Sequence, residues 1–84
     1  MPMKDIEALR KKIDQIDRSV ARLLMLRIET VRKIGKIKKT NNAPALDRKR
    51  EAQVINNVKK SSQNNKFIAD IYRRIIEYSR KIQK

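Results

Sequence analysis

The first half of the sequence carries one long heptad repeat, and it predicts a single long helix. Apolar residues follow one another at alternating steps of three and four positions, the heptad spacing of a helix that packs along a seam. The seam begins with Ile6, Leu9, Ile13, Ile16, Val20 and Leu23. The same register continues through Arg27, Thr30, Ile34 and Ile37. The helix is therefore expected to run from about Asp5 to about Lys39.

A helix of this length does not suit a small compact monomer. At ~1.5 Å per residue it would span roughly 50 Å. A compact chain of 84 residues would have a radius of gyration of only about 12 Å. Two such helices lying side by side would bury each other's seams, so the repeat favours the association of two chains.

The rest of the chain predicts two shorter helices. Residues 40–44 are turn-rich and end in Pro44, which disfavours helix in the residue before it. Asp47 is a good N-cap for a short helix that ends near residues 61–65. Heptad spacing then returns at Ile68, Ile71, Ile75, Tyr78 and Ile82, flanked by Tyr72, Ile76, Ser79 and Gln83. The chain is thus expected to be all-α, with long, short and medium helices in one domain, residues 1–84.

The composition excludes much of the usual chemistry of active sites. The sequence contains no cysteine and no histidine, which removes disulfides, thiolates and the commonest general base and metal ligand. Arg, Lys, carboxylates and amides remain, and neither a cofactor nor a metal is expected. No apolar run reaches the ~18 residues of a membrane span, and no signal-peptide stretch is recognised. A cytoplasmic location without a membrane partner is predicted.

The charge indicates an anionic ligand without choosing one. Lys and Arg number 23 against 9 Asp and Glu, for a formal net charge of +14. Such a field attracts nucleic acid, anionic lipid or small polyanionic metabolites. The joint abundance of Lys, Ile and Asn would also follow from an A+T-rich genome, without any selected ligand.

Three basic residues stand on or beside the seam. Arg27 occupies a core position, where its charge requires a bound anion, a buried carboxylate of the protein or an extended path to solvent. Lys38 lies eleven residues further on nearly the same face, unless it is only a solvated helix end. Arg10 is about 25 Å from Arg27 along the helix. An antiparallel dimer would bring Arg10 of one copy toward Arg27 of the other, although an exposed seam flank is the simpler interpretation.

Two polar pairs complete the candidate residues. Asp47 and Glu51 are one helical turn apart, with Arg50 between them, and helix capping with a solvated glutamate is the alternative interpretation. Ser79 and Gln83 are also four residues apart. They would present a hydroxyl and an amide beside an apolar stripe, or simply mark a helix boundary.

Taken together, these motifs resemble one family over essentially the whole chain. The matching stretches are LRKKIDQID at 9–17, LLMLR at 23–27, IGKIK at 34–38, PALDRKRE at 44–51 and IIEYSRKIQ at 75–83. They are similar, with their spacing preserved, to the all-helical chorismate mutases of the AroQ class. The resemblance implies an isomerase that converts chorismate to prephenate on the shikimate pathway to phenylalanine and tyrosine. It also implies an intertwined homodimer with two active sites.

The resemblance also implies a role for each candidate residue. Arg10, from the partner chain, and Arg27 would bind substrate carboxylates. Lys38 would contact a carboxylate and the ether oxygen, and Gln83 would be the second donor to that oxygen. Glu51 and the backbone of Asp47 would contact the ring hydroxyl, and Arg50 would supply a supporting charge beside them. Ser79 would donate a hydrogen bond to a substrate carboxylate.

Two alternatives remain beside the mutase. Isochorismate pyruvate lyase shares the scaffold and the arginine and lysine side chains that bind substrate. Residues 47–51 favour the mutase, because their acid and flanking charge should contact the chorismate hydroxyl. A basic helical dimer that binds nucleic acid belongs to another class. Arg27 in the seam and the scarcity of aromatic side chains disfavour it, so only weak, non-specific association with nucleic acid is expected.

Overall fold

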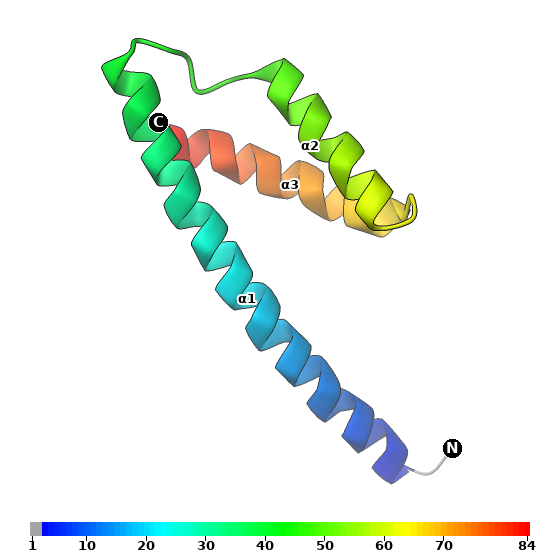
Figure 1. Cartoon of the computed structure of the whole chain (residues 1–84). Coiled ribbons are helices and arrows are strands. Elements are labelled where there is room, and N and C mark those ends of the chain that lie inside the picture. The colour runs from blue at the N-terminus through cyan, green and yellow to red at the C-terminus, as the bar shows by residue number, and fades with distance from the viewer. Residues whose placement is uncertain (1–2) are drawn as a thin grey trace.

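The computed structural model describes residues 3–84, which form helices joined by loops. Helix α1 spans Met3–Thr40, α2 spans Arg48–Ser61 and α3 spans Lys66–Gln83 (Figure 1). No strand occurs in this part of the chain. The predicted order of a long, a short and a medium helix is confirmed. The boundaries differ slightly, because Thr40 and Ser61 still belong to helices.

Side-chain caps begin the two shorter helices. The carboxylate of Asp47 accepts a hydrogen bond from the backbone N–H of Arg50 at 3.0 Å, as its predicted N-cap role requires. Asn65 caps α3 in the same way. Asn42 and Asn64 adopt positive φ angles of 55° and 61°, a conformation that asparagine tolerates better than most residues. These turns fix the directions in which α2 and α3 leave their loops.

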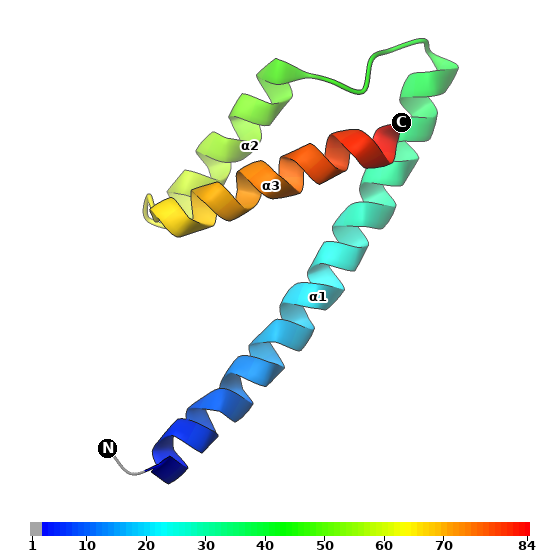
Figure 2. The same cartoon turned by 180° about the vertical axis from the view of Figure 1, so that it is seen from behind.

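Helix α3 joins the other two helices. It packs against the C-terminal half of α1 and against α2, whereas α1 and α2 do not pack against each other (Figure 2). The buried residues are few: Val31 and Gly35 in α1, and Ala69 and Ile76 in α3. The core of a single chain is therefore confined to the region around α3.

The molecule is elongated, and half of α1 has no neighbour. The principal extents are 59 × 24 × 16 Å and the radius of gyration is 16.7 Å, against the ~12 Å of a compact chain of this length. The N-terminal half of α1 extends away from the other helices (Figure 1). Its seam residues are about half exposed: Leu9, Ile13, Ile16, Val20 and Leu23. No helix in residues 3–84 is both long enough and apolar enough to cross a membrane.

The heptad row of α3 also faces outward in the single chain. Ile71 and Tyr78 are 55% and 57% exposed, whereas Ile76 of the flanking row is 6% exposed. An apolar groove of about 430 Å³ lies along this outer face and reaches Leu24 and Ile28 of α1. Monomeric proteins rarely leave so much continuous apolar surface in water.

Candidate active site

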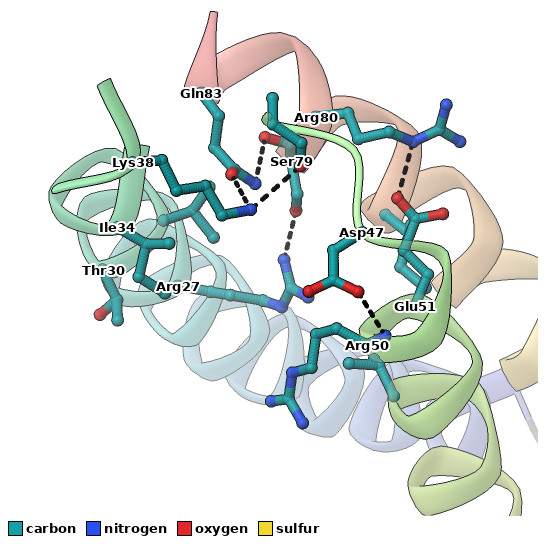
Figure 3. Close-up of a pocket in the computed structure, with 14 residues that line it drawn as sticks. Arg27, Thr30, Ile34, Lys38, Asp47, Arg50, Glu51, Ser79, Arg80 and Gln83 are labelled. Carbon is teal, nitrogen blue, oxygen red and sulfur yellow. Dashed lines mark hydrogen bonds and ion pairs between the residues drawn. The ribbon is translucent and has the colours of Figure 1, made fainter. Parts of the chain in front are cut away.

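A pocket of about 230 Å³ lies where the last turns of α3 meet α1 and the start of α2 (Figure 3). Helix α1 supplies one wall, α3 a second wall, and the loop before α2 with its first turns a third. The lining residues are Arg27, Thr30, Val31, Ile34, Lys38, Ala45, Asp47, Arg50, Glu51, Val54, Ile76, Ser79, Arg80 and Gln83. The pocket mixes charged and amide groups with aliphatic side chains, as small-molecule sites commonly do.

Helical periodicity places the lining residues of α1 and α3. On α1, steps of three, four and four residues bring Thr30, Ile34 and Lys38 onto the face that carries Arg27. On α3 the same periodicity aligns Ser79 and Gln83. The two faces meet over the pocket, so side chains far apart in the sequence converge.

Lys38 and Gln83 form the best-defined contact in the pocket. The Lys38 ammonium donates hydrogen bonds to Gln83 Oε1 at 2.7 Å and to the carbonyl oxygen of Ala45 at 3.0 Å. An ammonium has three donors and no acceptor, so it holds the amide oxygen of Gln83 and turns the amide nitrogen elsewhere. That nitrogen makes only a long contact of 3.3 Å, to the backbone carbonyl of Ser79. One ammonium hydrogen and one N–H of the amide therefore remain as donors.

Arg27 reaches across from α1 to α3. Its guanidinium donates a hydrogen bond to the hydroxyl of Ser79 and lies 5.8 Å from the centroid of the Tyr72 ring. Ser79 in turn donates to the carbonyl of Ile75 at 2.8 Å. The guanidinium of Arg27 thus contacts a hydroxyl and an aromatic ring. It does not pair with a carboxylate of residues 3–84, so that sequence-based alternative is wrong. Its remaining N–H groups are free to bind an anion.

The start of α2 brings acidic groups to the same pocket. Glu51 is half-buried, and its Oε2 lies 2.9 Å from Nε of Arg80. Asp47 and Arg50 are exposed at the rim, and the Asp47 side chain is occupied in capping α2. The capping interpretation of Asp47 is therefore confirmed, while the interpretation of Glu51 as merely solvated is not.

The pocket carries an excess of positive charge. Four cationic side chains, Arg27, Lys38, Arg50 and Arg80, line it against the two carboxylates Asp47 and Glu51, a difference of +2. These four cations come from three different helices, so their convergence results from the fold. Residues 3–84 contain no group of three or more carboxylate, histidine or cysteine side chains placed to hold a metal ion. The arrangement suits a small dianion.

Seven of the eight predicted site residues line this pocket, and Arg10 is the one that does not. Arg10 is exposed on the projecting half of α1. Sequence reasoning missed Arg80 and the aliphatic residues of the pocket wall. Helical periodicity could have identified the two missed residues of α3. Ile76 lies one turn from Ser79, and Arg80 lies one turn from Gln83.

Fold and site together define a small all-helical protein with a cationic pocket for a small anionic ligand. Residues 9–84 match the family described as chorismate mutase type II. The chain therefore belongs to the chorismate mutase type II family.

Two relatives extend this comparison. The chain is 29% identical over 89 aligned positions to a bifunctional chorismate mutase/prephenate dehydratase from Aquifex aeolicus. The alignment covers 98% of this chain but 25% of that protein, so the chain spans about a quarter of its curated relative. A solved structure of a conserved hypothetical protein from Pyrococcus furiosus superposes with a TM-score of 0.84 at 38% identity. That superposition covers 95% of this chain and 96% of the other, and it supports the same fold.

Proposed function

We propose that two copies of this chain form a chorismate mutase that converts chorismate to prephenate, with residues 1–84 as one domain. The observation that carries the proposal is the contact between Lys38 and Gln83, which joins an ammonium and an oriented amide over one cationic pocket. The reaction belongs to phenylalanine and tyrosine synthesis, and we assign the enzyme to the cytoplasm.

The reaction fits a pocket built from cations and amides. Chorismate rearranges in one unimolecular pericyclic step, in which the ether carbon–oxygen bond breaks while a new carbon–carbon bond forms. The step needs no nucleophile, proton shuttle, metal or cofactor. What remains for the protein is to hold the enolpyruvyl arm over the ring and to stabilise negative charge on the ether oxygen.

Lys38 and Gln83 are the donors for the ether oxygen. Because Lys38 already holds Oε1 of Gln83, the amide can offer only its N–H₂ group to a ligand. A charged donor and a neutral donor then face the oxygen on which charge develops. Such fixed donors are most effective in a site that largely excludes water.

Arginine side chains position the two carboxylates. Arg27 presents a planar guanidinium that is steadied by Ser79 and Tyr72, and such a group binds a carboxylate through two parallel hydrogen bonds. On substrate binding, the Ser79 hydroxyl turns its hydrogen from the Ile75 carbonyl to a substrate carboxylate, while its oxygen still accepts from Arg27. The second arginine is Arg10 of the partner chain, because Arg10 is too far along α1 to reach this pocket in its own chain.

The start of α2 recognises the ring hydroxyl. Glu51 accepts a hydrogen bond from that hydroxyl, together with a contact from the backbone of Asp47. Arg50, at the rim of the pocket, supplies a supporting positive charge. The Asp47 side chain acts only by capping α2, which fixes this turn in place.

A homodimer explains the exposed seam. The half-exposed apolar residues of α1 and the groove of about 430 Å³ beside α3 offer surface for a second copy. If the long helices pair antiparallel, the projecting half of α1 carries Arg10 to the pocket of its partner. Each pocket, open in the single chain, is then completed by the other chain.

The direct test is an assay of purified protein on chorismate, with prephenate and pyruvate both quantified. We expect prephenate as the product without added metal, nucleotide or reductant, and undiminished activity after dialysis against a chelator. Pyruvate as the main product would instead indicate a lyase, and loss of activity after chelation would contradict the mechanism.

A further inference from the structure

One ion pair differs from the others in the described part of the chain. Nε of Arg80 lies 2.9 Å from Oε2 of Glu51 and thereby links α3 to α2. The other two ion pairs, Arg73 with Asp70 and Arg74 with Glu77, each lie within α3, and their side chains are more than half exposed. Exposed pairs of this kind contribute little. The Arg80 pair alone joins two walls of the pocket.

The geometry of the pair separates the two oxygens of Glu51. Glu51 is 24% exposed, and the contact with Arg80 engages Oε2, which leaves Oε1 for a ligand. The Nε atom of Arg80 is buried and its hydrogen does not align with the carboxylate, so the contact is an ion pair without a hydrogen bond. Figure 3 shows the terminal amino groups of Arg80 turned away from Lys38 and Arg27. Arg80 therefore lines the pocket with its Nε directed at Glu51, while its terminal amino groups point away from the cations that would bind substrate.

We propose that Arg80 is a positioning residue that holds the Glu51 carboxylate on the α2 wall, where it accepts the substrate hydroxyl. This inference rests on the proposed mutase function. Arg80 acts through Glu51 and makes the site selective for a ring that carries a hydroxyl at this place.

The charges of the pocket explain why Glu51 needs such a partner. Arg27 and Arg50 line the same pocket and are free to attract a mobile carboxylate. If Glu51 turned toward Arg27, it would neutralise the cation that binds substrate and would also repel the incoming dianion. An arginine behind the carboxylate removes both consequences. It also restricts a flexible side chain before substrate arrives.

A double-mutant cycle on kcat/KM tests the inference. The variants are Arg80→Met, Glu51→Gln and the double variant, each measured with chorismate. We expect Arg80→Met to lower kcat/KM by about 10- to 100-fold, the scale of a small displacement in a site. Most of this loss should come from KM, because the hydroxyl contact exists in the ground state as well. In the Glu51→Gln background, Arg80→Met should change kcat/KM by less than about twofold.

Further variants separate positioning from charge and from folding. Arg73→Met removes one positive charge from an exposed position of the same helix, and we expect unchanged kinetics. Arg80→Lys keeps the charge without the planar group and should recover part of the loss. If Arg80→Met does not fold, Arg80→Gln replaces it in the cycle. A purely structural role of Arg80 would reduce the active fraction, which lowers kcat at constant KM in both backgrounds.

The outcomes distinguish this inference from the proposed function. Equal losses from Arg80→Met with and without Glu51→Gln, or no loss at all, would overturn the role of Arg80 while the mutase activity stands. If the unmodified protein forms no prephenate, the proposed function fails. Crystal structures with and without Arg80→Met then decide on positioning alone. We expect Glu51 to leave its rotamer in the variant, and an unmoved Glu51 refutes the inference.

Discussion

Gly35 of α1 lies directly against Gln83 of α3. A Cβ atom built on Gly35 would stand 3.0 Å from Cα of Gln83 and 3.3 Å from both its Cβ and its Cγ. The obstacle is backbone rather than a flexible side chain, so a rotamer change cannot relieve it. The missing side chain lets α3 approach α1 at the turn where Lys38 meets the Gln83 amide.

Gly35→Ala should therefore separate stability from activity. Alanine favours a helix by ~0.5–1 kcal/mol over glycine. This gain should offset the cost of the close contact with Gln83, so the melting temperature should change little. The added methyl group should displace Gln83 by a few tenths of an ångström and lower kcat about tenfold, less than the 10²-fold of a 1 Å misplacement. Thermal unfolding and steady-state kinetics are the measurements, with Gln15→Ala at an exposed position of α1 as the control. Wild-type kcat in Gly35→Ala would show that this close approach does not serve the site.

Lys38→Ala tests the donor to the ether oxygen. Turnover should fall by about 10²–10³-fold, as for loss of one transition-state donor. Folding should survive, at a cost of about 1 kcal/mol for the hydrogen bonds to Ala45 and Gln83. Lys39→Ala removes the same charge from an exposed neighbour and should leave turnover unchanged. Near-normal turnover in Lys38→Ala, together with collapse of DNA binding, would assign the residue to a polyanion instead.

The sequence predicts the helices well because their signals are local. The heptad seam, the Asp47 cap and the turn-rich residues 40–44 each act over a few positions, and the helix ends agree within one or two residues. Periodicity does not reveal which apolar row faces inward. In α3 the heptad row with Ile71 and Tyr78 stays exposed, while Ile76 of the flanking row is buried. That choice depends on packing against α1 and α2, which no local pattern encodes.

The site follows the same division. The spacing on α1 groups Arg27 with Lys38, and four-residue steps single out Glu51 and Gln83. The resemblance to the mutases then suggests what each of them does. Neither source identifies Arg80, because its importance comes from a contact between α2 and α3. The sequence also does not determine which groups contact the Arg27 guanidinium. In the structure they are the Ser79 hydroxyl and the Tyr72 ring. Contacts between helices are settled only once the chain is folded.

Ile16→Asp tests whether the seam is an interface. Ile16 is 51% exposed in the single chain, so a carboxylate there costs a monomer little. In a paired seam the same charge would be buried without a partner, which costs several kcal/mol and should raise the dimer dissociation constant by at least about 100-fold. Sedimentation and activity at several protein concentrations measure the effect. Gln15→Asp, off the seam on the same turn, is the matched control, and an intact, active Ile16→Asp dimer would contradict the interface.

Complementation between inactive variants tests the shared site most directly. Arg10 and Arg27 lie seventeen residues apart on α1, too far to reach one small substrate from the same chain. Arg10→Ala and Arg27→Ala homodimers should each be nearly inactive. When the two variants are unfolded together and refolded in equal amounts, about half of the dimers are mixed, and symmetry leaves one of the two sites in each mixed dimer intact.

Roughly a quarter of wild-type activity should therefore return on mixing, since the other site of each mixed dimer carries both lesions. Mass spectrometry of the native complexes counts the mixed dimers, and the recovered rate should scale with that count. A double Arg10→Ala/Arg27→Ala variant mixed with unmodified chain is the control. There each site of the mixed dimer lacks one arginine, so those dimers should be silent. If confirmed mixed dimers of the single variants stay inactive, the arginines do not come from different chains, and the antiparallel arrangement is wrong.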